Sequence, residues 1–497
     1  MLRAATHLVV FACAAVLAAP AAAATGLFVG FADDGPKWTG DAAVAPARTL
    51  GASAFRLSVP WTPGEAAVSG TTASQLDTAI ANTYGLRVVF AVYAEDAADA
   101  PVDPGRRAEF CSFTRSLLER YPTVNDVVIW NEPNSSRFWA PQFASDGTGV
   151  APRAYAALLA DCWDELHAYR TDVNVLAPAT SAHGFDEHAA PRKSHSPVNF
   201  IVRLGEAYRA SGRQAPIFDT VAHHAYGLSS IERPWKKHTE HVVGLGDWEK
   251  LMTSYRDAFA GTPQPVPGEC VRFDCVGIWY LESGFQVEVP RDKLRHYRGT
   301  ENGQTLPALA SRPDDASLDG AAPDQATQIV DAVRLAYCQP YVEGYFNFLL
   351  RDETDLRGWQ SGVQWADGTW KPSMPAFKQA IREANDGSIR CGSLKGGALT
   401  GVDTTPPAQP TSPTATPVET GGVALRWRRG SERDLAGYYV YRSDPSIGGY
   451  TRLTDLVKAS RFVDETAEPG VDYGYYVAAV DSAGNEGALS EPVASRN

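Results

Sequence analysis

Two glutamates in this 497-residue chain each end a short run of apolar residues and are followed by residues typical of turns. Glu132 ends the run Val127–Glu132, and Glu282 ends the run Val276–Glu282. Apolar runs of this length are typical of buried parallel strands, and barrels of such strands carry their chemistry at the strands' carboxyl ends. Two carboxyl groups that face each other across one cleft can cleave a glycosidic bond.

The elements that must position these glutamates alternate between buried strands and amphipathic helices. The predicted strands are Leu27–Phe31, Ala54–Val59, Arg87–Tyr93, Val127–Trp130, Val173–Ala177, Thr220–His224, Gly277–Leu281 and Gly344–Leu349. The predicted helical segments include Arg106–Arg120, Arg153–Tyr169, Asn199–Ala210, Ala326–Cys338 and Ala376–Ala384. Eight strand–helix units favour a closed (β/α)₈ TIM barrel, an α/β fold, over an open sheet.

Two connections between the predicted strands are unusually long for a compact domain. The first runs from Gly227 to Cys275, and the second runs from Val287 to Pro323. Both start at the carboxyl end of a strand, which is the catalytic face of a barrel. Because long loops in compact domains usually have a function, we expect both segments to border the cleft.

The two ends of the chain differ in composition from the barrel segment. Arg3, the apolar run Leu8–Ala19 and small residues up to Ala24 predict a signal peptide over residues 1–24 and a secreted chain. The catalytic barrel is predicted over residues 25–392, and a Pro/Gly/Thr-rich linker over 393–406. Residues 407–497 show short alternating strands, which predict a small all-β immunoglobulin-like sandwich.

Six cysteines remain after the predicted signal peptide is removed, and an even number in an exported protein favours disulfide bonds. No cysteine spacing resembles a zinc site. Six cysteines allow many pairings. The predicted barrel suggests one set, with two bonds between neighbouring outer helices and one across a short loop. These pairs are Cys111–Cys162, Cys338–Cys391 and Cys270–Cys275.

Charge and hydropathy exclude several classes of partner. The net charge of −13 and the pI near 5.3 argue against nucleic acid and against anionic membranes, because both partners call for basic patches. No stretch after the predicted signal peptide approaches the roughly 18 apolar residues of a membrane span. We therefore expect a carbohydrate substrate, no nucleic-acid partner and no membrane anchor; the sequence does not specify an oligomeric state.

Both predicted domains resemble known families. Trp130-Asn131-Glu132-Pro133 on the fourth strand, with Glu282 ending the seventh, resembles clan A of the retaining glycoside hydrolases, closest to family thirty-nine or family five. This resemblance covers residues 26–385. The C-terminal segment, with Trp427 and the alternation Tyr473–Ala479, resembles a fibronectin type III domain.

The clan A resemblance implies roles for the residues around both glutamates. Glu132 would be the acid/base and Glu282 the nucleophile. Asn131 would hydrogen-bond the 2-hydroxyl of the sugar that is cleaved. Arg56, on the second strand, would keep Glu282 ionised.

Further substrate-binding residues follow from the same resemblance. His224 and Tyr226 match a His-x-Tyr pattern at the end of the sixth strand. Tyr226 would hydrogen-bond the nucleophile, and His224 would position the sugar or the acid. Asn347 ends the eighth strand, where the clan more often has an aromatic residue. Trp359 or Trp365 is then expected to supply the missing aromatic platform.

Together these residues predict a secreted, retaining glycoside hydrolase that acts on an extracellular polysaccharide or oligosaccharide. No metal or organic cofactor is implied, because two carboxyl groups suffice for the reaction. A transglycosylase using the same glutamates is one alternative. A carbohydrate-binding or adhesion protein without activity is another. The glycan itself stays open, because specificity lies in the loops.

Overall fold

The computed structural model describes residues 26–495, apart from 191, 239–240, 272–273, 301–323, 392–406, 419–420, 433–434, 444–449, 455 and 482–486. The predicted signal peptide and linker lie outside the described residues. Among the residues described, no helix is long and apolar enough to cross a lipid bilayer.

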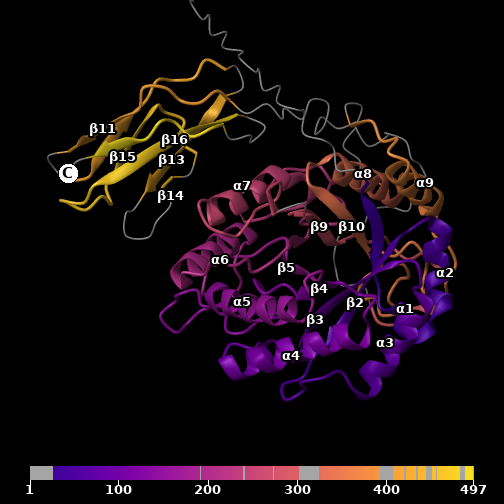
Figure 1. Cartoon of the computed structure of the whole chain (residues 1–497). Coiled ribbons are helices and arrows are strands. Elements are labelled where there is room, and N and C mark those ends of the chain that lie inside the picture. The colour runs from indigo at the N-terminus through magenta and orange to yellow at the C-terminus, as the bar shows by residue number, and fades with distance from the viewer. Residues whose placement is uncertain are drawn as a thin grey trace, which may run out of the picture.

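Eight parallel strands form a closed barrel in the ring order β1-β10-β9-β6-β5-β4-β3-β2, as predicted (Figure 1). All eight overlap the strands expected from the sequence. Their bounds are β1 Phe28–Ala32, β2 Ala54–Pro60, β3 Arg87–Tyr93, β4 Asp126–Ile129, β5 Asn174–Thr180, β6 Thr220–His224, β9 Ile278–Ser283 and β10 Val342–Phe348.

Helices surround the barrel as an outer ring (Figure 1). The α-helices described are α1 Gly35–Thr39, α2 Asp41–Leu50, α3 Gly70–Asn82, α4 Pro104–Arg120, α5 Ala151–Tyr169, α6 Pro197–Ser211, α7 Trp248–Phe259, α8 Gln325–Cys338 and α9 Met374–Asn385. Short 3₁₀ turns are η1 Ala97–Asp99, η2 Leu245–Asp247 and η3 Leu294–His296. Several helices begin at a side chain that accepts a backbone N–H, as Asp103, Ser196 and Asp324 do.

The alternation of side chains along each strand builds two apolar layers, and β3 shows this clearly. Val88, Phe90 and Val92 point outward and pack in the large core between the strands and the helices. Val89 and Ala91 point inward and pack in the core that fills the barrel itself. The barrel is therefore a solid scaffold, and its chemistry is confined to its rim.

The long connection from Gly227 to Cys275 is more ordered than predicted. It contains α7, which covers the barrel after β6, and a hairpin of β7 Cys270–Val271 and β8 Asp274–Cys275. Leu251, Tyr255 and Ala258 recur at helical spacing and are buried. The second long connection is only partly described, because residues 301–323 lie outside the described part of the chain.

Two of the three predicted disulfide bonds are present. Cys111–Cys162 joins α4 to α5, and Cys338–Cys391 joins the end of α8 to the segment after α9. Cys270 and Cys275 lie opposite each other in the β7–β8 hairpin, and Cys275 is disulfide-bonded. The side chain of Cys270 lies outside the described part of the structure.

The C-terminal domain consists of two small antiparallel sheets, as predicted. One has the order β11-β12-β15 and the other the order β14-β13-β16-β17. The bounds are β11 Thr414–Pro417, β12 Val423–Arg426, β13 Leu435–Ser443, β14 Tyr450–Arg452, β15 Arg461–Asp464, β16 Tyr473–Asp481 and β17 Val493–Ser495. Trp427, Tyr438 and Tyr475 are buried in the core of this domain. Asp257 of α7 accepts a hydrogen bond from Tyr441 and pairs with Arg452.

Candidate active site

The carboxyl ends of the barrel strands bring the two predicted catalytic glutamates together. Glu132 lies three residues after the end of β4, and Glu282 lies within β9. A register shift between β6 and β9 places Glu282 opposite His224. Such an irregularity re-aims side chains, and here the glutamate reaches the mouth of the barrel.

The distance between the two glutamates is short. Ligand-type atoms of Glu132, Glu282 and His224 all lie within 4.8 Å of one another. Carboxyl groups about 5–5.5 Å apart are typical of retaining glycosidases, whereas inverting enzymes leave about 6.5–9.5 Å for a water molecule. The spacing in this site fits the retaining geometry.

Arg56 holds the predicted nucleophile and Asn131 in one network. Its guanidinium pairs with Glu282 Oε1 at 2.9 Å and donates to Asn131 Oδ1 at 2.6 Å. Arg56 and Asn131 are buried, with exposed fractions of 3% and 4%. The guanidinium thus holds a positive charge against the carboxyl group that is expected to attack the sugar.

His224 and Tyr226 lie between the two glutamates. Nδ1 of His224 is 2.8 Å from Glu132 Oε1 and 3.6 Å from Glu282 Oε2. The Tyr226 hydroxyl donates to Glu282 Oε2 at 3.1 Å. Tyr226 therefore contacts the expected nucleophile, and His224 contacts the expected acid, in agreement with the positions predicted for both residues.

Burial shifts the pKa values of Glu132 and His224 in opposite directions. Burial raises the pKa of Glu132 from 4.5 to about 7, although the charges of His183 and Arg56 and a hydrogen bond from Ser181 oppose this shift. Burial also lowers the pKa of His224 from 6.5 to about 4. At neutral pH His224 is therefore uncharged, while Glu132 can hold the proton that a general acid must donate.

The backbone around Glu132 is held in an uncommon conformation. Trp130 and Glu132 have φ angles of 69° and 42°, in the left-handed region that side chains other than glycine rarely adopt. The Trp130 indole is fully buried and donates to the carbonyl of Phe138 at 2.8 Å. Strain of this kind persists where the surroundings fix the backbone, and it is common at active sites.

Trp359, one of the two tryptophans expected to form the aromatic platform, lines the cleft, whereas Asn347 does not. Asn347 is fully buried, and its amide donates to the carbonyls of Leu349 and Ser361. It does not line the cleft, so the expectation that Asn347 contacts substrate is corrected. Phe348 and Trp359 line the cleft, with ring centroids 5.5 Å apart. Trp365 instead packs in a small buried cluster.

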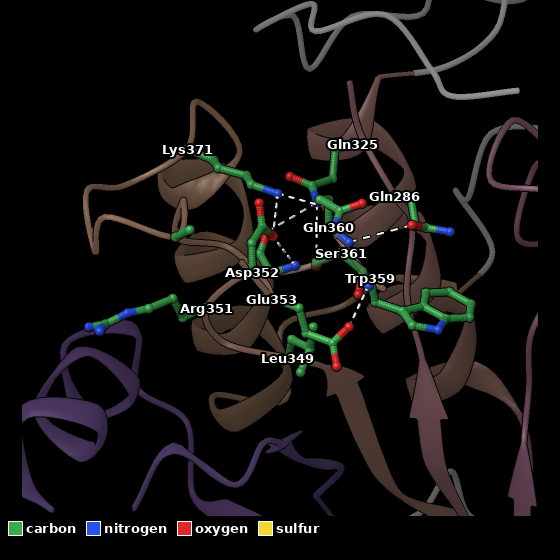
Figure 2. A network of polar contacts seen from close by, with 12 residues as sticks. Gln286, Gln325, Leu349, Arg351, Asp352, Glu353, Trp359, Gln360, Ser361 and Lys371 are labelled. Atoms are coloured by element: carbon green, nitrogen blue, oxygen red, sulfur yellow. Dashed lines mark hydrogen bonds and ion pairs between the residues drawn. The ribbon is translucent and has the colours of Figure 1, made fainter. Parts of the chain in front are cut away.

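A buried polar network supports the loop that carries Trp359 (Figure 2). Lys371 and Asp352 form an ion pair at 2.8 Å, and neither side chain is exposed. Lys371 also donates to the carbonyl of Gln360 at 2.8 Å. Glu353 accepts the backbone N–H of Trp359 at 2.7 Å. The platform is therefore fixed by the protein before any sugar arrives.

Removal of Lys371 is expected to destabilise this loop and the fold. In Lys371→Met the Asp352 carboxyl stays buried without its partner, and breaking a buried pair in this way costs about 3–5 kcal/mol. Urea unfolding measures the loss. Arg357→Met is the matched control, because Arg357 pairs with Asp355 on the same loop but is 73% exposed, and its loss should change stability little. Equal losses in both variants would contradict this account of the loop.

Sequence reasoning missed polar residues that follow β5. Ser181 and His183 line the cleft beside Glu132. The predicted strand stopped at Ala177, because Pro178 reads as a strand terminator. In the structure β5 continues to Thr180. Side chains that follow the end of a barrel strand face the cleft, so a prediction with the correct strand end would have included both residues.

Comparisons with known proteins give two kinds of match, one over most of the chain and one over 18% of it. No protein-family model matches the chain. A family 39 glycoside hydrolase from Bacteroides cellulosilyticus is similar over 89% of this chain and 81% of its own, with 12% identity and a TM-score of 0.48. A β-xylosidase from Caulobacter crescentus is similar over 89% and 96%, with 15% identity and a TM-score of 0.42.

Two further similarities each cover 18% of the chain. A fibronectin type III-like protein from Clostridium thermocellum shares 28% identity over 92% of its own length, with a TM-score of 0.17. An amylopullulanase of Thermoanaerobacterium saccharolyticum is 37% identical over 91 residues, and the match spans 7% of that relative's length. Two matches that cover most of the chain are thus to proteins named as a family 39 glycoside hydrolase and a β-xylosidase, and their segments include a barrel domain such as the one described above. In this chain the barrel is followed by a fibronectin type III-like domain.

Proposed function

We propose that this protein is a secreted, retaining glycoside hydrolase that cleaves O-glycosidic bonds by double displacement. The observation that carries the proposal is the pair Glu132 and Glu282, with carboxylate oxygens within 4.8 Å and in contrasting surroundings. Glu282 is paired with the Arg56 guanidinium, while burial raises the pKa of Glu132 to about 7. One group is therefore suited to attack and the other to give up a proton.

In the first step a carboxylate oxygen of Glu282 attacks the anomeric carbon. The bond from that carbon to the leaving oxygen breaks, and Glu132 gives its proton to that oxygen. The sugar is then held as an ester of Glu282. Because Arg56 occupies Asn131 Oδ1, the Asn131 amide N–H₂ is the group that can donate to a sugar hydroxyl.

In the second step a water molecule displaces Glu282 from the anomeric carbon. Glu132 has given up its proton in the first step, and Glu282 carries no charge as an ester, so Glu132 can act as a base. Glu132 takes a proton from water, the water oxygen attacks the anomeric carbon, and the ester bond breaks. The product keeps the configuration of the substrate at that carbon, because two inversions have occurred.

Secretion is supported by features outside the site. The N-terminal Arg3, the apolar run Leu8–Ala19 and the small residues after it have the pattern of a signal peptide. The disulfide bonds Cys111–Cys162 and Cys338–Cys391 fit an oxidising compartment. For a secreted chain the substrate would be an extracellular polysaccharide or oligosaccharide.

The experiment that tests the proposal is sugar release from a broad panel of polysaccharides and aryl glycosides. Product configuration is followed by proton NMR from the first minutes of the reaction. Retained configuration in the first product is expected. An inverted first product would overturn the double-displacement mechanism. Transfer of the sugar to an acceptor in place of water would favour a transglycosylase.

Activity is expected to survive removal of divalent metals. Glu132, His224 and Glu282 are, among the described residues, a group close enough to hold a metal ion. However, Arg56 already pairs with Glu282, and the raised pKa of Glu132 favours its protonated form, which is a poor ligand. Hydrolysis rates before and after dialysis against EDTA should therefore agree. Loss of activity that zinc or calcium restores would contradict this expectation.

A further inference from the structure

One tryptophan of the barrel is exposed, and it lies on the rim of the catalytic cleft. The chain has twelve tryptophans, all within the described residues, and Trp38 alone among them is strongly exposed, at 61%. Trp38 belongs to the short helix α1, which follows β1 at the catalytic face. It lines the same cleft as Glu132 and Glu282.

The exposed indole stands on a firmly anchored segment. Lys37, beside it, is only 7% exposed; its ammonium donates to the Ser58 carbonyl at 2.8 Å and pairs with Asp34 at 3.1 Å. Asp34 in turn accepts the backbone N–H of Ser58 on β2. The Lys37 ammonium also lies 5.2 Å from the centre of the Trp38 ring. A fixed, exposed aromatic face has the form of a preorganised binding surface.

Trp38 and Trp359 reach the cleft from different loops, after β1 and after β10. Trp359 packs against Tyr226 of the loop after β6, with ring centroids 5.1 Å apart. Trp38 lies on the β1 side, where Asp33 accepts the backbone N–H groups of Leu350 and Arg351 and so joins the β1 loop to the β10 loop. Figure 2 shows Arg351 and Trp359 extending from the β10 loop in opposite directions.

The cleft is also larger than one sugar requires. Its volume is about 1210 Å³, above the range of about 300–1,000 Å³ that is typical of pockets for drug-sized ligands. A substrate with one sugar ring, held at the glutamates and the Trp359 platform, would leave a second aromatic face on the rim unused. The same face would bind a pyranose unit further along an oligosaccharide, because C–H groups on one side of a pyranose pack on an indole.

We propose that Trp38 is the platform of a second, distal sugar-binding subsite, which makes the protein selective for oligosaccharides over single-sugar glycosides. The kinetic test of this inference rests on the proposed function, whereas the test by sugar binding does not. The subsite binds a pyranose ring by stacking on the exposed indole. Arg351, which lines the same cleft, offers hydrogen-bond donors to hydroxyl groups of the chain.

The test compares Trp38→Ala with the native protein in two assays. In the kinetic assay, hydrolysis of xylo-, cello- and mannohexaose is compared with hydrolysis of the matching p-nitrophenyl monosaccharides. Truncating Trp38 should raise KM for the cleaved hexaose roughly tenfold and leave the monosaccharide constants unchanged. In the binding assay, the same hexaoses are titrated into Glu282→Gln protein with and without Trp38→Ala.

Tyr84→Ala is the matched control, because Tyr84 is 88% exposed but lies between α3 and β3, at the opposite face of the barrel. An unchanged KM for hexaose in Trp38→Ala, with activity intact, overturns the subsite alone. Equal losses on hexaoses and monosaccharides also overturn it. Hexaose binding that depends on Trp38, without hydrolysis by the native protein, supports the subsite and overturns the proposed function. No hexaose binding and no hydrolysis overturns both.

Discussion

Replacing Glu282 with glutamine is expected to lower kcat by about 10⁴-fold or more, because loss of a covalent nucleophile removes the first chemical step. Glutamine keeps the shape of the side chain and can still accept from Tyr226. The fold should therefore be unchanged, and the loss should appear in kcat. The measurement is release of p-nitrophenol from whichever aryl glycoside the native protein cleaves.

A chemical rescue separates a nucleophile from a residue that merely shapes the site. Azide added to Glu282→Ala should restore turnover and give a glycosyl azide of inverted configuration, because a small anion then attacks in place of the carboxylate. Glu343→Gln is the matched control, since Glu343 accepts from Trp279 near the amino end of β10 and should keep full activity. Strong residual activity in Glu282→Gln would assign the nucleophile to another residue.

The native rate is expected to fall as pH rises through about 7, and Glu132→Gln should remove this limb of the profile. Burial raises the pKa of Glu132 to about 7, so above that pH the acid has lost the proton that the leaving oxygen needs. Without the acid, substrates with poor leaving groups should slow by about 10²–10⁴-fold, whereas dinitrophenyl glycosides should slow much less in the first step. The measurement is kcat/KM against pH for both kinds of substrate.

The raised pKa of Glu132 also predicts how the free energy of unfolding depends on pH. The pKa of Glu132 is higher in the folded chain than its ordinary value of 4.5, so the folded state binds more protons between these two values. Stability from this group is therefore complete below about pH 4.5 and is lost as pH rises through about 7. Glu132→Gln should flatten that part of the curve of unfolding free energy against pH. Parallel curves for the two proteins would contradict the assigned pKa.

The barrel strands could be predicted because each is a buried apolar run, and such a run can be recognised from its own residues alone. The pairing of Glu132 with Glu282 also followed, since parallel strands end at one face. The register shift that sets Glu282 opposite His224 could not be predicted, because it depends on the fit between β6 and β9. Sequence patterns report which face a residue takes only while the alternation is regular.

Asn347 shows the limit of reading a site by position. It is the last residue but one of β10, near a position where the clan more often has an aromatic residue, and it was therefore expected to contact sugar. The structure turns its amide toward backbone carbonyls of the following loop, since a buried amide must satisfy its donors. Which carbonyls come near depends on the path of that loop, and local sequence does not determine this path. Trp359 was found because its type, an aromatic residue near the cleft, is itself informative.

The disulfide bond between Cys338 and Cys391 has a mechanical consequence. The segment it encloses contains β10, which closes the barrel against β1, and α9, which covers it. Tension applied through the C-terminal domain reaches the barrel at Cys391. The bond passes that tension directly to the end of α8, so α9 and β10 carry none of it and are not peeled from the barrel. An enzyme tethered by its C-terminal domain would keep its closing strand under pull, whereas reduction of this bond would expose first α9 and then β10 to the tension.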